Sequence, residues 1–356
     1  MTEPEILFDR RGPLGLVTLN RPKALNALTL GMIRAFDAQL AAWQEDPDVK
    51  AVVVRGAGGK AFCAGGDVVA MYREGVAERA GEPVGTLRRD FFRAEYGLNR
   101  RIKRLPKPYI PLVDGISMGG GMGISMHASH RVVTERTMIA MPETGIGLFP
   151  DVGGTHFLPR CPGGVGLYLG LTGERLKGAD VVEAGVGDVL VPSDRLDSLV
   201  DAIAASGCGA DEVMAILRAH AAPAADAPLA ALRPAIDRCF AGASVEAIMA
   251  ALDAEGTDWA RGVLDIFARV APTSLKVTLE AMRRGAALEF EDCMVMEYRL
   301  SQSFLAADDF YEGVRALLVD KDKNPRWNPA TLDAVDAARV ERYFATPKAG
   351  DLSFTV

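Results

Sequence analysis

The sequence has few of the residue types that build metal centres or disulfide frameworks. Its 356 residues include five cysteines and four histidines. The cysteines lie far apart, without a CxxC pair and without companion histidines at the spacing of zinc ligands. We therefore expect no metal site, free and mostly buried thiols, and a reducing compartment. The cysteines are Cys63, Cys161, Cys208, Cys239 and Cys293.

Long apolar runs and an excess of positive charge are also missing. No run approaches the ~20 residues that span a bilayer, and no signal peptide precedes the first expected strand at residues 6–8. Lys and Arg total 40 against 47 Asp and Glu, so the net charge of -7 provides no general attraction to nucleic acid or anionic membranes. These features predict a cytoplasmic protein with no nucleic-acid or membrane partner, in which any anionic ligand is bound locally.

The hydrophobic pattern alternates between strand-like runs and helix-like repeats. Short β-branched runs at residues 14–19, 49–54, 108–113 and 131–134 read as strands, and helical periods separate them, the first beginning near Thr29. This alternation predicts an α/β protein with crossover connections.

Composition changes after about residue 200. The part at about 201–255 is rich in alanine and contains Pro-linked helical stretches, and amphipathic helices follow from Pro272 onward. We expect a core at 1–200 that carries the functional site and a helical C-terminal region at 201–356.

Two glycine-rich loops each follow a predicted strand. The first is KAFCAGGD at residues 60–67, and the second is GISMGGGMG at residues 115–123. Such loops can aim backbone N–H groups at one point, where each donor to a developing oxyanion is worth roughly 2.7–4 kcal/mol of barrier. They can equally be plain turns between strand and helix, and spacing alone does not choose.

Two carboxylates stand eight positions apart in the segment MPETGIGLFPDVGG. Glu143 and Asp151 lie among apolar residues and glycines, surroundings that raise the pKa of an acid. Glu143 suits a general base or nucleophile, with Asp151 orienting substrate or water. The alternative is that Glu143 caps a helix and Asp151 is a turn residue after Pro150.

Two other patterns are weaker. Residues 115–119 match the GxSxG nucleophile elbow at Ser117, but the glycines that follow are poor material for the helix that an elbow starts. His127 and His130 stand three apart, as a metal pair could, but packed or surface histidines are more common. We assign neither pattern a role.

Several segments, taken in order, resemble the crotonase (enoyl-CoA hydratase/isomerase) superfamily. Those of the core are NRPKALNAL, KAFCAGGD, DGISMGGGMG and MPETGIGLFPDVGG. Within the superfamily, other segments resemble the 3-hydroxyisobutyryl-CoA hydrolase family: FFRAEYGLN, LTGERLKGADVVEAG, SLKVTLEAM, MEYRLSQ and DFYEGVRALLVDKDKNPRWNP. The resemblance implies the ClpP-like crotonase fold, a spiral of ββα units, followed by a C-terminal α-helical region.

The resemblance also implies roles for individual residues. The N–H groups of Gly66 and Gly120 would form the oxyanion hole for a thioester carbonyl. Glu143 and Asp151 would be the catalytic acids, and Glu95 an additional acid that reaches the acyl pocket. The residues implied to line coenzyme A are Lys23, Ala24, Ala64 and Asp67.

One departure from the hydratase pattern decides the reaction that we expect. Gly123 stands where hydratases of this superfamily carry their first catalytic Glu. The resemblance therefore implies hydrolysis of 3-hydroxyisobutyryl-CoA in valine breakdown, with Glu143 activating water or attacking directly.

The expected ligand is a small acyl-CoA, and no cofactor is needed because coenzyme A is part of the substrate. The alternatives are an enoyl-CoA isomerase or hydratase of the same superfamily and a non-catalytic acyl-CoA-binding protein. Assembly into homo-oligomers stays open.

Overall fold

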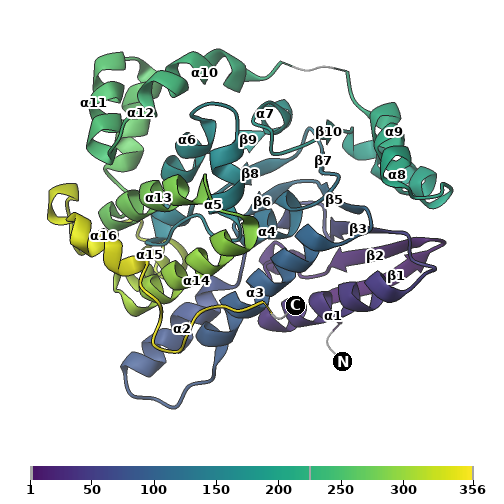
Figure 1. Ribbon diagram of the computed structural model, residues 1–356, viewed down its shortest axis with the longest axis horizontal. Coiled ribbons are helices and arrows are strands. Elements are labelled where there is room, and N and C mark those ends of the chain that lie inside the picture. The colour runs from purple at the N-terminus through teal and green to yellow at the C-terminus, as the bar shows by residue number, and fades with distance from the viewer. Residues whose placement is uncertain (1–2, 224–225, 355–356) are drawn as a thin grey trace. The chain divides into compact units, whose positions relative to one another are not determined.

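The computed structural model describes residues 3–223 and 226–354 (Figure 1). It contains two compact units, each built from segments that are separated in sequence. Unit 1 comprises Met1–Gly66, Gly97–Ala140 and Arg175–Ala231, and unit 2 comprises Asp67–Tyr96, Met141–Glu174 and Leu232–Val356. The predicted division at residue 200 follows chain order and does not coincide with these units. Within the predicted alanine-rich part, residues 224–225 lie outside the described residues.

The strands belong to unit 1. Within the described ranges they form a six-stranded sheet in the order β1-β2-β3-β5-β7-β10 and a four-stranded sheet in the order β4-β6-β8-β9. The bounds are β1 (Ile6–Arg11), β2 (Leu14–Leu19), β3 (Ala51–Gly56), β4 (Ala61–Cys63), β5 (Tyr109–Val113), β6 (Ile116–Met118), β7 (Val132–Val133), β8 (Met138–Ala140), β9 (Leu176–Lys177) and β10 (Val189–Leu190).

Successive strand pairs produce a spiral. The pairs β3/β4, β5/β6 and β7/β8 each place one strand in each sheet, and β3, β5 and β7 run parallel, as do β4, β6 and β8. A helix follows β4 and another follows β6, namely α2 (Val68–Arg79) and α4 (Gly120–Met126). This arrangement agrees with the predicted spiral of ββα units.

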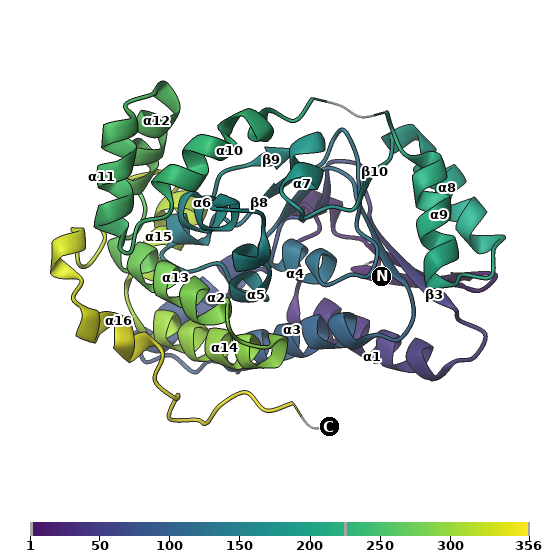
Figure 2. The same cartoon turned by 45° about the horizontal axis from the view of Figure 1, so that its top comes forward.

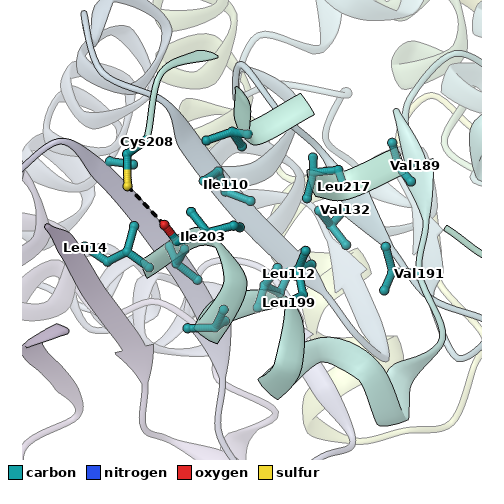
Figure 3. Close-up of a cluster of buried hydrophobic side chains, with 14 residues drawn as sticks. Leu14, Ile110, Leu112, Val132, Val189, Val191, Leu199, Ile203, Cys208 and Leu217 are labelled. Atoms are coloured by element: carbon teal, nitrogen blue, oxygen red, sulfur yellow. Dashed lines mark hydrogen bonds between the residues drawn. The ribbon is translucent and has the colours of Figure 1, made fainter. Parts of the chain in front are cut away.

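A core of aliphatic side chains stabilises unit 1. Strand residues Leu14, Ile110 and Val132 pack against Ile203 of α8 (Leu196–Ala204) and Leu217 of α9 (Ala210–His220) (Figure 3). Burying each such side chain contributes about 1.5–3 kcal/mol. The thiol of Cys208, which donates to the Ile203 carbonyl at 3.3 Å, adds to the same cluster. All five cysteines are buried and free, as predicted.

Two further helices of unit 1 come before α8 and α9 in the chain. Helix α1 (Leu30–Glu45) begins where Thr29 accepts a hydrogen bond from the Met32 N–H at 3.1 Å, and α7 (Ala179–Glu183) lies between β9 and β10. Helix α3 (Leu87–Arg104) crosses from unit 2 to unit 1 after Tyr96. Its N-terminal half therefore belongs to the same unit as the predicted acids.

Unit 2 is helical. Its remaining helices are α5 (Gly154–Phe157), α6 (Val165–Thr172), α10 (Pro228–Cys239, which begins in unit 1), α11 (Val245–Glu255), α12 (Asp258–Phe267), α13 (Pro272–Gly285), α14 (Phe290–Ala306), α15 (Asp309–Val314) and α16 (Ala337–Tyr343). Helices α11 and α12 run side by side (Figure 2). Beyond Leu190 the described chain contains helices and no strand, in agreement with the predicted helical C-terminal region.

Short 3-10 and π-helical turns complete the described elements. They are η1 (Pro22–Ala24), η2 (Glu143–Ile146), η3 (Leu158–Arg160), η4 (Ser193–Arg195), the π-helix η5 (Arg315–Val319) and η6 (Leu332–Ala334). Among all the helices described, none has the length and apolar character needed to cross a membrane.

Candidate active site

The two predicted glycine loops meet within unit 1. Each predicted loop contains a three-residue strand, β4 in the first and β6 in the second, and its glycine cluster follows that strand. Since β4 and β6 are parallel neighbours, both glycine clusters leave the sheet at the same end. A Cβ atom on Gly121 would lie 2.1 Å from the carbonyl oxygen of Cys63, and one on Gly65 would lie 3.7 Å from the Gly120 nitrogen. Gly65 also has a φ of 114°, which favours glycine. Glycine is therefore required for the two loops to approach this closely.

The two predicted oxyanion donors lie on these loops. Gly120 is the first residue of α4, so its N–H has no acceptor within the helix. Gly66 forms an isolated parallel bridge with Leu28, whose N–H donates to the Gly65 carbonyl at 2.8 Å. Both donors thus stand on backbone whose position is fixed by neighbouring strands.

The residues predicted to line coenzyme A fall into two groups. Lys23 and Ala24 are exposed in η1, and the Ala64 N–H donates to the carbonyl of Leu25 at 3.0 Å, so these three lie close together in unit 1. Asp67 belongs to unit 2, where its carboxylate accepts from the Ala70 N–H at 3.2 Å and caps α2. Asp67 therefore has a structural role of its own.

Unit 2 brings the three predicted acids together. Glu95 lies on α3, Glu143 opens η2, and Asp151 follows Pro150 in the turn before α5. Their exposed fractions are 2%, 5% and 5%. Considering only described atoms, Glu95 Oε1 and Glu143 Oε2 are buried without a hydrogen-bond partner. Buried acceptors of this kind are costly unless a ligand satisfies them.

Burial raises the pKa of each acid, and repulsion by Asp151 adds to the shift at Glu95 and Glu143. Burial raises the pKa of Glu143 and of Glu95 well above the usual value, and the nearby Asp151 carboxylate raises both further. Burial raises the pKa of Asp151 to about 7, against the lowering effect of a hydrogen bond from Tyr96. Asp151 therefore exchanges a proton near neutral pH, as general acid–base chemistry requires, and Glu95 and Glu143 keep their protons to higher pH than a free glutamate does.

Two residues of this cluster were missed by the sequence analysis. The Tyr96 hydroxyl donates to Asp151 Oδ2 at 2.8 Å. Glu297 of α14 accepts hydrogen bonds from the N–H groups of Gly153 and Thr155, just after Asp151. Both stand in quoted family segments, FFRAEYGLN and MEYRLSQ, but nothing in a single sequence pairs them with Asp151.

The weaker sequence patterns gain no support. Ser117 is fully buried in β6, and its hydroxyl has no hydrogen-bond partner in the described part of the chain. The ring nitrogens of His130 contact the Ser129 hydroxyl at 2.8 Å and the Ala210 carbonyl at 3.0 Å, as in a packed histidine. Within residues 3–223 and 226–354, no group of three His, Cys, Asp or Glu side chains is arranged to hold a metal ion.

Curated relatives resemble the chain over nearly its full length. The 3-hydroxyisobutyryl-CoA hydrolase of Xenopus tropicalis is 46% identical over 98% of this chain and 90% of its own length. The human 3-hydroxyisobutyryl-CoA hydrolase is 42% identical over 98% of this chain and 91% of its own length.

Two solved structures are similar in sequence and in fold. One is a carnitinyl-CoA dehydratase from Mycobacterium thermoresistibile, with a TM-score of 0.90, 46% identity and coverage of 98% of each chain. The other is an enoyl-CoA hydratase from Rhodobacter sphaeroides, with a TM-score of 0.89, 39% identity and coverage of 99% of this chain and 100% of that one. They confirm the predicted crotonase fold.

One prediction from the sequence is contradicted by these relatives. The hydrolases of Xenopus tropicalis, rat and human are named as mitochondrial proteins, which points away from the predicted cytoplasmic location. The prediction rested on the lack of an apparent signal peptide and of a long apolar run, and neither feature separates the cytoplasm from the interior of an organelle.

A family model gives the broadest comparison. The model described as enoyl-CoA hydratase/isomerase matches residues 14–344, which include both glycine loops, the three acids and Glu297. Because this match and the curated relatives each span nearly the whole sequence, the chain belongs to the enoyl-CoA hydratase/isomerase family, within the crotonase superfamily.

Proposed function

We propose that this protein hydrolyses 3-hydroxyisobutyryl-CoA to 3-hydroxyisobutyrate and free coenzyme A, a step in valine breakdown. The observation that carries the proposal is the pairing of an intact Glu143, buried with its Oε2 unsatisfied among the described residues, with a glycine at position 123. The names of the curated relatives support the same reaction.

Hydration of an enoyl-CoA is the second candidate, because the two similar structures are named as a hydratase and a dehydratase. Hydration in this superfamily uses two carboxylates that share one water. Gly123 is buried in α4 and offers no side chain for that task. Glu143 alone suits attack on a thioester better than addition of water across a double bond.

The proposed reaction begins at the thioester carbonyl. The N–H groups of Gly66 and Gly120 would donate to its oxygen and stabilise the negative charge that develops there. Glu143 would then either take a proton from an attacking water or attack the carbonyl carbon itself, giving a mixed anhydride that water cleaves. In both routes the C–S bond breaks, a C–O bond forms, and the sulfur of coenzyme A leaves with the proton that water supplies.

Asp151 and Glu95 are proposed to hold the 3-hydroxyl of the acyl group. Glu95 Oε1 is buried and unsatisfied within the part of the chain described, so a substrate hydroxyl would supply a missing donor. A site built in this way rejects analogues without the hydroxyl by up to roughly 10⁴–10⁵-fold. Lys23, Ala24 and Ala64 are proposed to line coenzyme A, with Asp67 contributing mainly through its helix cap.

The test is release of free thiol from 3-hydroxyisobutyryl-CoA by the purified protein, with hydration of crotonyl-CoA followed in parallel. We expect thiol release without hydration, and a loss of about 100-fold or more in Glu143→Gln. Glu280→Gln, the same change at the partly exposed partner of Arg284 in unit 2, is the matched control and should keep full activity. An acyl adduct on the peptide that carries Glu143, trapped by rapid quenching, would distinguish direct attack from activation of water.

Hydration or double-bond migration without thiol release would refute the hydrolase proposal. It would place the reaction among the hydratases or isomerases of the family. Binding of acyl-CoA without any turnover would instead support a non-catalytic protein.

A further inference from the structure

The segment MEYRLSQ resembles the hydrolases, yet the proposed reaction uses none of its residues. Its acid, Glu297, lies in the middle of α14 and is fully buried, with an exposed fraction of 0%. Its carboxyl oxygens accept three hydrogen bonds: from the Gly153 N–H on Oε2 at 2.7 Å, and from the Thr155 N–H at 2.9 Å and hydroxyl at 2.6 Å on Oε1. A buried carboxyl group is tolerated only where donors of this kind compensate for lost water.

The three donors belong to a turn whose backbone is strained. After Asp151 the backbone has positive φ at two successive residues, 50° at Val152 and 84° at Gly153. Valine rarely adopts this conformation because its branched side chain crowds the following carbonyl. Such strain persists only where surrounding structure imposes it. Glu297 supplies that constraint from a helix more than a hundred residues further along the chain.

The opposite side of the turn is also restricted. A Cβ atom on Gly285 of α13 would lie 2.0 Å from the Thr155 carbonyl oxygen, so the backbone of the turn packs directly on α13. The Asp151 carbonyl accepts the Gly154 N–H at 2.7 Å, which closes the turn on itself. A displacement at residues 153–155 is therefore passed to Asp151 rather than absorbed by the loop.

We propose that Glu297 is a positioning residue that fixes the turn carrying Asp151 and thereby sets the preference of the enzyme for acyl groups with a 3-hydroxyl. The inference rests on the proposed function, in which Asp151 binds that hydroxyl. Glu297 acts through Gly153 and Thr155 and does not itself contact the substrate.

Glu297→Gln is the most conservative test. The amide keeps the size of the side chain and the acceptor for both donors of Thr155, but it turns an NH2 group toward the Gly153 N–H. We expect kcat/KM for 3-hydroxyisobutyryl-CoA to fall about 10- to 100-fold, as small displacements of a reacting group do. The slower hydrolysis of isobutyryl-CoA, which lacks the hydroxyl, should change by less than about twofold.

A second pair of variants guards against a failure of Glu297→Gln to fold. Thr155→Val removes only the hydroxyl bond and should lower the preference for the hydroxylated substrate in the same direction but less. Thr155→Ser keeps a hydroxyl and should therefore keep the preference of the unaltered enzyme. Ser301→Ala, one turn along α14, removes a hydroxyl that donates to the Tyr298 carbonyl at 2.9 Å and should leave the preference unchanged.

The decisive comparison is made in an Asp151→Asn background. If Glu297 acts through Asp151, adding Glu297→Gln should cause little further loss, because the two changes disrupt one interaction. Equal losses on both substrates that add to the effect of Asp151→Asn would overturn the inference and leave Glu297 with a structural role alone. If the unaltered enzyme releases thiol from neither substrate, the proposed function fails instead, so the two failures are distinguishable.

Discussion

The acids of unit 2 depend on neighbours for their chemistry. Burial raises the pKa of Asp151 to about 7, and the Tyr96 hydroxyl lowers it by donating to Oδ2. Burial also raises the pKa of Tyr96 well above its usual value, so the hydroxyl keeps its proton and remains a donor at neutral pH. Tyr96 therefore favours the ionised form of Asp151.

Tyr96→Phe tests this relation. Loss of a hydrogen bond to a charged group, about 1.5–3 kcal/mol, corresponds to a rise of one to two units in the pKa of Asp151. If Asp151 acts in its ionised form, activity is lost as pH falls through its pKa. The midpoint of the kcat/KM profile should therefore move upward by roughly one pH unit in the variant. An unchanged midpoint would show that Tyr96 does not set the charge of Asp151.

The residues of the site differ in how far the sequence alone predicts them. Glu143 and Asp151 were candidates because both lie within one short segment of glycines and apolar residues, and the family resemblance favoured the catalytic interpretation over the structural one. Glu95, Gly66 and Gly120 came only from the family resemblance. Tyr96 and Glu297 could not be predicted, because their partners lie 55 and 144 residues away and only the folded chain brings them together.

At the scale of elements, two strands of three residues each position the glycine clusters. The strand at Leu14–Leu19 was predicted with its observed bounds, since an apolar run between turn residues at 11–13 and 20–22 identifies it. Strands β4 and β6 have three residues each, too few for a period to show, and they lie inside stretches predicted as loops. Their parallel pairing brings the two loops together.

Gly121→Ala tests how tightly these elements fit. The new methyl group would meet the Cys63 carbonyl at 2.1 Å, where backbone must move. We expect a loss of about 1–3 kcal/mol in the free energy of unfolding, measured in urea, together with reduced kcat as Gly120 shifts. Gly262→Ala, in the interior of α12 with no atom within 4 Å in the described chain, should instead stabilise by about 0.5–1 kcal/mol. Equal effects of the two variants would contradict the close fit.

The stability of the whole molecule should depend on these buried acids. Burial raises the pKa of Glu297 to about 8, against the lowering effect of its donors Thr155 and Gly153. Between the ordinary glutamate pKa of about 4.3 and 8, the folded state holds a proton that the unfolded state has lost. The stability that Glu297 contributes is therefore fully present below that window and is lost as pH rises through it.

Glu297→Gln should remove this dependence. Across the window the free energy of unfolding of the unaltered protein should fall relative to the variant by up to about 1.4 kcal/mol per pH unit. Urea unfolding at pH 5, 6, 7 and 8 measures the difference, and Ser301→Ala should run parallel to the unaltered protein. Parallel curves for Glu297→Gln as well would mean that the pKa of Glu297 is not raised.

The hydrogen bonds between Thr155 and Glu297 also have a consequence for biosynthesis. Glu297 follows Thr155 by 142 residues, so the turn that carries Asp151 leaves the ribosome long before the helix that fixes it. At about 5–20 residues per second, roughly 7–30 s separate the two events. During this interval the turn has no partner for its donors, and the strained backbone after Asp151 is free to relax. A nascent chain therefore carries no finished acid cluster until its C-terminal helices have been made.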